Sequence, residues 1–267
     1  MNENATDILF AEERKEAIVK LVNERKKVLV PELIDYFKMS PATIRNDLRD
    51  LEAAGLIKRT HGGAIPSSAI RVGFEMDSNS KNVELVPAKE AIARKAVEWV
   101  EEGDIIVLDT GTTTLEMAKR LLHKKNVTVI VNDIEIASVL EKFEGVNVVI
   151  IGGTLRRNFH CTVGPFAVKL LSELNVDKVF LGTNAFSAEK GCTTPDINQA
   201  EIKKTMVQIA TQVIVLCDSS KIGKNSFVQF APPSDIDALV TDDNVDSALL
   251  KEISETGIDV HLAEVAK

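Results

Sequence analysis

Six consecutive residues of this chain, Asp109 to Thr114, have the composition of an anion-binding turn. They read DTGTTT and stand between a short apolar run and the helical pattern TLEMAKRL. Gly111 permits a tight turn, while Thr112, Thr113 and Thr114 offer hydroxyls. Free amides at the start of a helix favour a negatively charged group. We therefore expect this turn to hold a phosphate.

Three further polar turns follow apolar runs, and each offers a different contact to a ligand. An asparagine can bond a ligand hydroxyl, although capping of the next helix is the favoured role for it. Paired glycines allow close approach, an arginine can bind phosphate bidentately, and an aspartate with a lysine supplies both signs of charge. The residues are Asn132 after one run, Gly152, Gly153 and Arg156 after the next, and Asp218 and Lys221 in CDSSKIG.

Each of these turns is a weak signal by itself, because a glycine turn after a strand is usually only a turn. A lysine near an aspartate is likewise usually a surface pair. On one edge of one sheet, however, the four turns would combine an anion cradle with carboxylates and cations that bind hydroxyls. Those are the requirements of a sugar phosphate.

Some of the same residue types also occur in catalytic sites. DTG is the active-site triplet of aspartic proteases, but those enzymes are rich in β-structure and no second DTG occurs here. His160 beside Cys161 is not favoured as a base and nucleophile, because adjacent residues rarely point at the same atom. We predict no catalytic residue.

The serious alternative is a sugar-phosphate isomerase, in which a carboxylate moves a proton between adjacent carbons and a lysine stabilises the enediolate. Asp109, Asp218, Lys203 and Lys221 are of the right types for this. The N-terminal segment described below argues against it, since an ordinary isomerase has no need of one.

The turns are positioned by alternating apolar runs and helical patterns from Lys89 onward. Continuous apolar strands joined by helices favour a mostly parallel sheet covered on both faces, with ligands at the carboxyl ends of the strands. The predicted strands are 105–109, 127–131, 146–151, 176–182, 212–218, 236–242 and 258–262.

The N-terminal segment predicts three helices of a helix-turn-helix domain. Ile18 and Val22 lie on one face of the first helix, and Pro31 suits the first turn of the second. In the third, Ser40 is the expected N-cap and Pro41 the first helical residue. Ile44, Leu48 and Leu51 form its buried face, and Gly55 ends it.

With that face inward, the polar residues at the start of the third helix point outward and could reach a DNA groove. The sequence LIKRTHGGA then fits a basic β-hairpin wing beside a phosphate backbone. A generic helical bundle would also expose cations. The order of the elements, rather than the charge, therefore favours a winged helix-turn-helix over a generic bundle. The predicted DNA contacts are Ser40, Pro41, Thr43, Arg45, Asn46, Arg49, Lys58, Arg59, His61 and Gly62.

The net charge of −8 suggests at first a protein that avoids nucleic acid. Residues 1–66, however, carry 11 basic and 11 acidic side chains, so the whole surplus of acid lies in residues 67–267. A stretch rich in glycine, proline, serine and asparagine separates the two parts. We predict a DNA-binding domain at 1–66, a linker at 67–87 and an effector-binding and oligomerisation domain at 88–267.

The remaining composition narrows the setting of the protein. No apolar run approaches the roughly 18 to 20 residues that span a bilayer, and the N-terminus lacks the layout of a signal peptide. The three cysteines are widely spaced, without a CxxC motif, so neither a disulfide framework nor a metal site is indicated. We expect a cytoplasmic protein with reduced thiols and no cofactor, metal or membrane partner.

The stretch MSPATIRNDLRDLEAAGLIKRTHGGA, from Met39 to Ala64, resembles the signature of DeoR-type bacterial transcription regulators. Asn46 stands where that family usually carries a second arginine. The resemblance continues through DTGTTT, the VND turn, IGG with its following arginine, VDKVFLGTNAF, EIKK and CDSSKIGK, so it covers nearly the whole chain.

This resemblance implies a winged helix-turn-helix followed by an α/β sensor domain similar to ribose-5-phosphate isomerase. It implies that Asp109, Gly111 and the three threonines hold a phosphate, and that Asn132, Arg156, Lys203, Asp218 and Lys221 face the sugar. We expect a repressor of a sugar uptake or catabolism operon, with double-stranded operator DNA and a phosphorylated sugar as partners. Paired half-sites require a homo-oligomer, a dimer or a tetramer.

Overall fold

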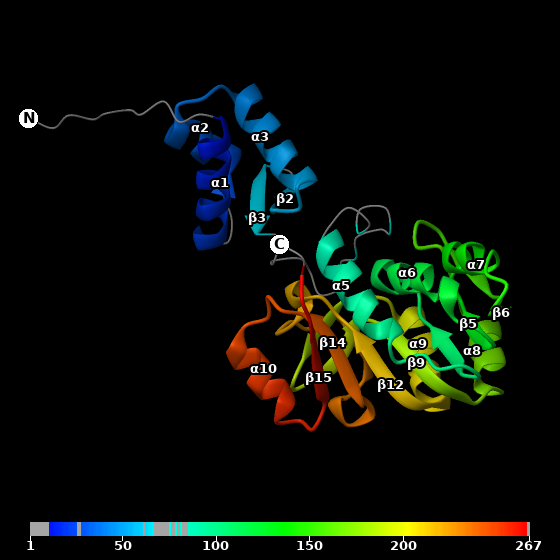
Figure 1. Cartoon of the computed structure of the whole chain (residues 1–267). Coiled ribbons are helices and arrows are strands. Elements are labelled where there is room, and N and C mark those ends of the chain that lie inside the picture. Colours follow the sequence, from blue (N-terminus) through cyan, green and yellow to red (C-terminus); the bar gives the residue numbers. More distant parts are fainter. Residues whose placement is uncertain are drawn as a thin grey trace, which may run out of the picture. The chain divides into compact units, whose positions relative to one another are not determined.

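The computed structural model describes residues 11–25, 28–60, 62–66, 75, 78, 81 and 85–265. The chain divides into two compact units, Met1–Arg71 and Val72–Lys267. Figure 1 shows the elements of each unit along the sequence. Within the described residues, no helix has the length and apolar character needed to cross a membrane.

The N-terminal unit is a helix-turn-helix with a β-hairpin wing, as the sequence predicts. The elements of this unit are α1 (Ala11–Arg25), β1 (Val28–Leu29), α2 (Val30–Phe37), α3 (Pro41–Ala53), β2 (Ile57–Thr60) and β3 (Gly63–Pro66). Strands β2 and β3 form the antiparallel hairpin, and β3 also pairs with β1, so the strand order is β1-β3-β2.

Local signals and apolar packing fix helix α3. The Ser40 side chain accepts a hydrogen bond from the Thr43 amide at 3.1 Å, which confirms it as the N-cap. Ile44, Leu48 and Leu51 are buried against the other helices and the wing, as predicted. This burial leaves the first turns of the opposite face open to solvent.

A buried ion pair, which the sequence did not predict, joins α3 to α1. Arg14 Nε donates to Asp47 Oδ2 at 2.7 Å and Arg14 Nη2 donates to Asp47 Oδ1 at 3.2 Å. Both side chains are buried. A bidentate contact of this kind fixes the orientation of the two helices as well as their distance.

The C-terminal unit is built on a seven-stranded sheet in which every neighbouring pair is parallel. The strand order is β15-β14-β12-β9-β4-β5-β6. All seven predicted strands are present, so the predicted α/β class is confirmed. Their bounds are β4 (Ile105–Leu108), β5 (Val127–Val131), β6 (Val146–Ile150), β9 (Val176–Gly182), β12 (Ala210–Leu216), β14 (Ala238–Asp242) and β15 (Asp259–Ala263).

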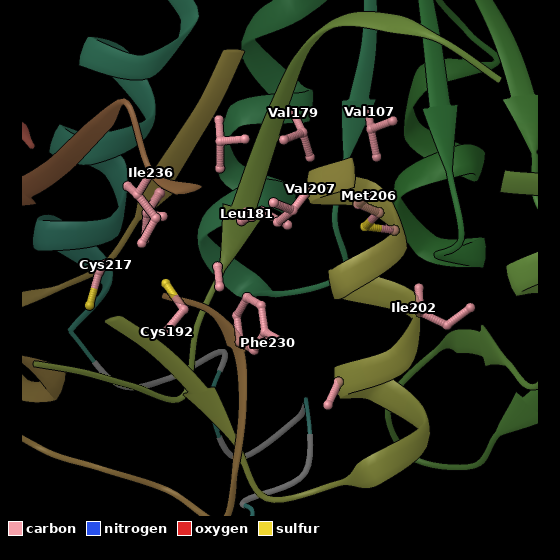
Figure 2. Close-up of a cluster of buried hydrophobic side chains, with 14 of the residues drawn as sticks. Val107, Val179, Leu181, Cys192, Ile202, Met206, Val207, Cys217, Phe230 and Ile236 are labelled. Atoms are coloured by element: carbon pink, nitrogen blue, oxygen red, sulfur yellow. The ribbon is translucent and has the colours of Figure 1, made fainter. Parts of the chain in front are cut away.

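Helices cover both faces of this sheet and create two apolar cores. One core contains residues of the first three helices and the other contains residues of the last three. The helices are α5 (Val86–Val97), α6 (Thr112–Lys119), α7 (Ile134–Leu140), α8 (Pro165–Ser172), α9 (Ile197–Ile209) and α10 (Ser247–Ser254). Figure 2 shows the second core, where α9 contributes Ile202, Met206 and Val207 beside the strands.

Short antiparallel strands, which the sequence did not predict, lie outside the main sheet. One is the hairpin of β7 (Thr154–Arg156) with β8 (Cys161–Val163). The other is a small sheet of β10 (Ala185–Ser187), β11 (Gly191–Thr194) and β13 (Val228–Ala231). Both follow strands of the main sheet in the chain, so they extend from the edge where the predicted ligand turns lie.

The order of the strands identifies one special position in the sheet. From β4 the chain adds β5 and β6 on one side, then crosses to place β9, β12, β14 and β15 on the other. The strand order therefore reverses between β4 and β9. Ligands of open α/β sheets bind outside the carboxyl ends of the strands at such a switch point.

Candidate functional site

A pocket lies at this switch point. The residues after β4 and after β9 line it, together with residues of α9 and of the turn after β12. Six predicted ligand residues are among its lining: Gly111, Thr112, Thr113, Thr114, Lys203 and Lys221. Among the described residues, no group of histidine, cysteine and acidic side chains could hold a metal ion.

The start of helix α6 forms one wall of the pocket. Gly111 adopts a φ of 147°, which favours glycine, and the helix begins at Thr112. Thr114 Oγ1 donates to the Gly111 carbonyl at 2.8 Å, which holds the turn in shape. Within the described chain, no side chain caps this helix start. Its first amides and the positive end of its dipole can therefore serve an anion.

Two lysines line the pocket, and each is paired with a buried aspartate. Lys203 Nζ donates to Asp109 Oδ2 and, at 2.9 Å, to the Gly182 carbonyl. Lys221 Nζ lies 3.0 Å from Asp218 Oδ2. The two aspartates are fully buried and are not part of the lining, so they position the lysines rather than face the cavity.

The two aspartates have opposite protonation tendencies. Burial raises the pKa of Asp109, and the Lys203 ammonium opposes that shift. Burial also acts on Asp218, but Lys221 and the Ser220 hydroxyl outweigh it and lower the pKa of Asp218. Among the described residues, no donor reaches Asp109 Oδ1, which is buried.

An acidic residue from the predicted linker also lines the pocket. Glu75 Oε1 accepts from Lys81 Nζ at 2.8 Å and from Asn184 Nδ2 at 3.0 Å. Its other oxygen, Oε2, accepts from Arg156 Nη1 at 2.7 Å. The Arg156 guanidinium stacks on the ring of Phe159, with 3.7 Å from Cζ to the ring centroid. Arg156 itself does not line the pocket, but it contacts Glu75 and Phe159, which do.

The other predicted ligand residues lie outside the lining. Asn132 is buried and its Nδ2 donates to the Thr162 carbonyl at 3.0 Å. Its predicted role as the helix cap is wrong, because Asp133 caps α7. Gly152 and Gly153 lie at the turn into β7. A β-carbon on Gly153 would come within 2.7 Å of the Val163 carbonyl oxygen, so this glycine permits close packing of the hairpin.

Thr110, within the predicted DTGTTT turn, also lines the pocket, but the sequence interpretation missed several other lining residues: Glu75, Ser78, Lys81, Phe159, Gly182, Thr183, Asn184, Gln199 and Leu216. Thr183 and Asn184 directly follow strand β9. The rule that drew attention to DTGTTT, a polar turn after a buried strand, would have found these two. No local signal marks Glu75 or Phe159.

Cys161 is not arranged as a nucleophile. It is buried, and Gln199 Nε2 lies 3.3 Å from its sulfur. Burial raises the pKa of Cys161 to about 11, so the thiolate is disfavoured near neutral pH.

The N-terminal unit presents a second candidate surface, on α3 and the wing. Ser40, Pro41, Arg45, Asn46, Arg49, Arg59 and Gly62 are exposed, while Thr43 and Lys58 are half-buried. Arg59 lies 3.7 Å from Glu52, whereas no described residue forms an ion pair with Arg45 or Arg49. His61 lies outside the described residues. The predicted contacts therefore share one accessible helix start and its adjoining hairpin.

Comparisons with known proteins match two separate parts of the chain to two family domains. Residues 14–69 match the DeoR-like helix-turn-helix domain, and residues 84–243 match the DeoR C terminal sensor domain. An HTH-type transcriptional regulator, GlpR of Haloferax volcanii, is 42% identical over 93% of this chain and 96% of its own length. The HTH-type transcriptional repressor GlcR of Bacillus subtilis is 33% identical over 96% of this chain and 98% of its own.

A solved structure, ribose 5-phosphate isomerase A from Methanocaldococcus jannaschii, aligns with 50% of this chain and 52% of its own. The TM-score is 0.37 and the identity 21%. This match is too weak to support an argument about the present protein.

Proposed function

This chain belongs to the DeoR family of helix-turn-helix transcription regulators, and we propose that it represses an operon for sugar uptake or breakdown under the control of a phosphorylated sugar. The pocket of the C-terminal unit binds the sugar phosphate. The helix-turn-helix of the N-terminal unit binds the operator.

The observation that carries the proposal is the convergence of a helix start and two lysines at the switch point. The first turn of α6 offers free amides, and Lys203 and Lys221 place two ammonium groups around the same pocket. A phosphate is the common group that matches both features. Thr183, Asn184 and Gln199 also line the pocket, and the hydrogen-bonding capacity that their protein partners leave unused can bond sugar hydroxyls.

DNA recognition rests on the exposed start of α3. Arg45, Asn46 and Arg49 reach base edges or phosphates, while Lys58 and Arg59 of the wing contact the backbone. One such helix covers only a few base pairs, so a homo-oligomer that reads paired half-sites supplies the specificity.

We propose a sensor without turnover rather than an isomerase. A catalytic base must reach a proton of its substrate. Asp109 is fully buried, does not line the pocket, and engages Lys203 and the Gly182 amide through Oδ2. Its position suits a structural anchor for Lys203. Incubation with pentose and hexose phosphates should give binding and no isomerised product, and product formation would contradict the sensor.

The test of ligand binding uses a panel of sugar phosphates in thermal-shift and gel-shift assays. A true effector raises the melting temperature of the full chain and changes its affinity for DNA from upstream of its target operon. The same sugars without phosphate should do neither. A panel that binds without any effect on DNA affinity would refute the coupling.

Two variants separate the roles of the two units. Thr112→Asp puts a negative charge at the first residue of α6, where acids stabilise a helix, so the fold should hold while the phosphate is repelled. Thr112→Ser is its matched control and should bind normally. Arg45→Ala should weaken operator binding and leave effector binding intact. An effector affinity of Thr112→Asp equal to wild type would contradict the proposed phosphate site.

A further inference from the structure

Three described residues lie between the wing and helix α5: Glu75, Ser78 and Lys81. We call them the connecting residues. All three line the effector pocket. Glu75 follows Pro66, the last residue of the wing, by nine positions and follows the boundary between the units at Arg71 by four. A change at these residues is therefore close in sequence to the DNA-binding unit.

Each connecting residue is tied to the C-terminal unit. Glu75 accepts from Arg156 and Asn184, and the Ser78 amide donates to the Asn158 carbonyl at 3.0 Å. The Lys81 carbonyl accepts from Lys89 of α5. The side chain of Lys81 pairs with Glu75, so this single carboxylate joins three donors on three separate segments.

Glu75 has an unusual electrostatic position. Its side chain is only 6% exposed, and it is the single acid among the described residues that line the pocket. Burial alone would raise the pKa of Glu75, but Lys81 and Arg156 together lower it. Glu75 therefore stays ionised as an internal anion in a pocket whose ligand is itself expected to be an anion.

Lys81 lines the pocket together with Lys203 and Lys221, and its ammonium pairs with Glu75. Burial lowers the pKa of Lys81, Glu75 opposes that shift, and the nearby charges of Lys221 and Lys203 add to it. Three ammonium groups thus face one pocket and repel one another. A phosphate among them would relieve that repulsion, and Glu75 supplies a negative charge at the same place when no ligand is bound.

We propose that Glu75 competes with the effector for Lys81, and that a phosphate entering the pocket displaces Glu75 from this lysine. This inference rests on the proposed function, since it assumes that the pocket binds a phosphorylated ligand. Loss of the Glu75–Lys81 contact leaves Glu75 held by Arg156 and Asn184 alone, which weakens the attachment of the connecting residues to the C-terminal unit. The regulatory signal starts there, four residues beyond the boundary with the DNA-binding unit.

The test measures binding of inorganic phosphate to the full chain by calorimetry. Glu75→Gln removes the competing charge and should tighten phosphate binding by about tenfold, the value of one charge-assisted hydrogen bond. Glu116→Gln is the matched control. Glu116 also pairs with a lysine and an arginine, Lys119 and Arg120, but lies outside the pocket lining. The Glu116→Gln variant should therefore bind phosphate with the affinity of wild type.

A double-mutant cycle separates competition for Lys81 from simple repulsion between two anions. Lys81→Met should weaken phosphate binding, and the gain from Glu75→Gln should shrink by about threefold or more in that background. An equal gain in both backgrounds would show that repulsion alone acts, and it would overturn the proposal.

The outcomes also distinguish this inference from the proposed function. Phosphate binding by wild type with no gain in Glu75→Gln overturns the competitor and leaves the effector pocket standing. No phosphate binding in any variant overturns both. In gel shifts without effector, Glu75→Gln should shift the operator affinity in the same direction as the sugar phosphate shifts that of wild type. A shift in the opposite direction would refute the link from Glu75 to the DNA-binding unit.

Discussion

The wing contains two adjacent glycines that the structure predicts to respond in opposite ways to the same substitution. A β-carbon on Gly63 would lie 1.9 Å from the Val28 carbonyl oxygen and 2.9 Å from Leu29 Cα. Real β-carbons keep at least 3.0 Å from such atoms. A β-carbon on Gly62 would meet no described atom within 4 Å, and its φ lies outside the left-handed region.

The loss of stability expected for Gly63→Ala follows from the separation of strands β1 and β3. Strand β1 must move by more than 1 Å from β3, which breaks the pairing of Val28 with Ala64 and of Leu29 with residue 63. Two backbone hydrogen bonds at about 1 kcal/mol each, with partial exposure of buried Val28, give a loss of about 2 to 4 kcal/mol. Gly62→Ala should change the free energy of unfolding by less than about 0.5 kcal/mol.

Amide hydrogen exchange of residues 28–66 in the full chain measures this difference. The single tryptophan, Trp99, lies in the C-terminal unit, so its fluorescence in a urea titration reports that unit separately. The Trp99 midpoint should be the same in wild type and both variants. Equal exchange free energies for Gly62→Ala and Gly63→Ala would contradict this prediction, since they would show that close backbone approach does not determine which glycine is required.

Three further predictions concern buried groups and the helix start. Asp47→Ala removes the carboxylate from the buried pair with Arg14, and should destabilise the N-terminal unit by about 2 to 4 kcal/mol in the same exchange experiment. Ser40→Ala removes the cap of α3 and should cost about 1 kcal/mol there, whereas Ser40→Asp should restore it. Burial raises the pKa of Cys161 to about 11 and that of Cys192 to about 12, so neither thiol should react with a disulfide reagent at pH 8 until the protein unfolds. Because burial favours the protonated thiols, their contribution to stability is present below about pH 9 and should be lost as the pH rises toward 11 to 12.

Local signals in the sequence were sufficient for the main elements. The seven strands of the large sheet are continuous apolar runs, and a parallel sheet buried on both faces needs such runs. Ser40 and Pro41 marked the start of α3 because an N-cap and a proline act within one turn. The strands of the small sheets have only three or four residues, too few for a period to be visible.

The candidate site likewise contains residues that local signals could predict and others that they could not. DTGTTT could be predicted to lie at the pocket because its glycine, hydroxyls and helix start are consecutive. Asn132 shows the limit of that reasoning: its type suits both a cap and a ligand contact, yet the packing of β8 beside it gives its amide the Thr162 carbonyl instead. Which of several suitable partners a polar group meets depends on the neighbouring segments.

The order of residues along the chain was enough to predict a DNA-binding part followed by an α/β part, the strands of the large sheet, and DTGTTT as a candidate anion-binding turn. These follow from periodicity and from capping, which act over a few residues. The contacts of Glu75 with Arg156, 81 positions away, and with Asn184, 109 positions away, depend on the folding of distant segments. A buried carboxylate must find donors wherever the fold brings them, so its partners are set by the packing of distant segments and not by its neighbours in the chain.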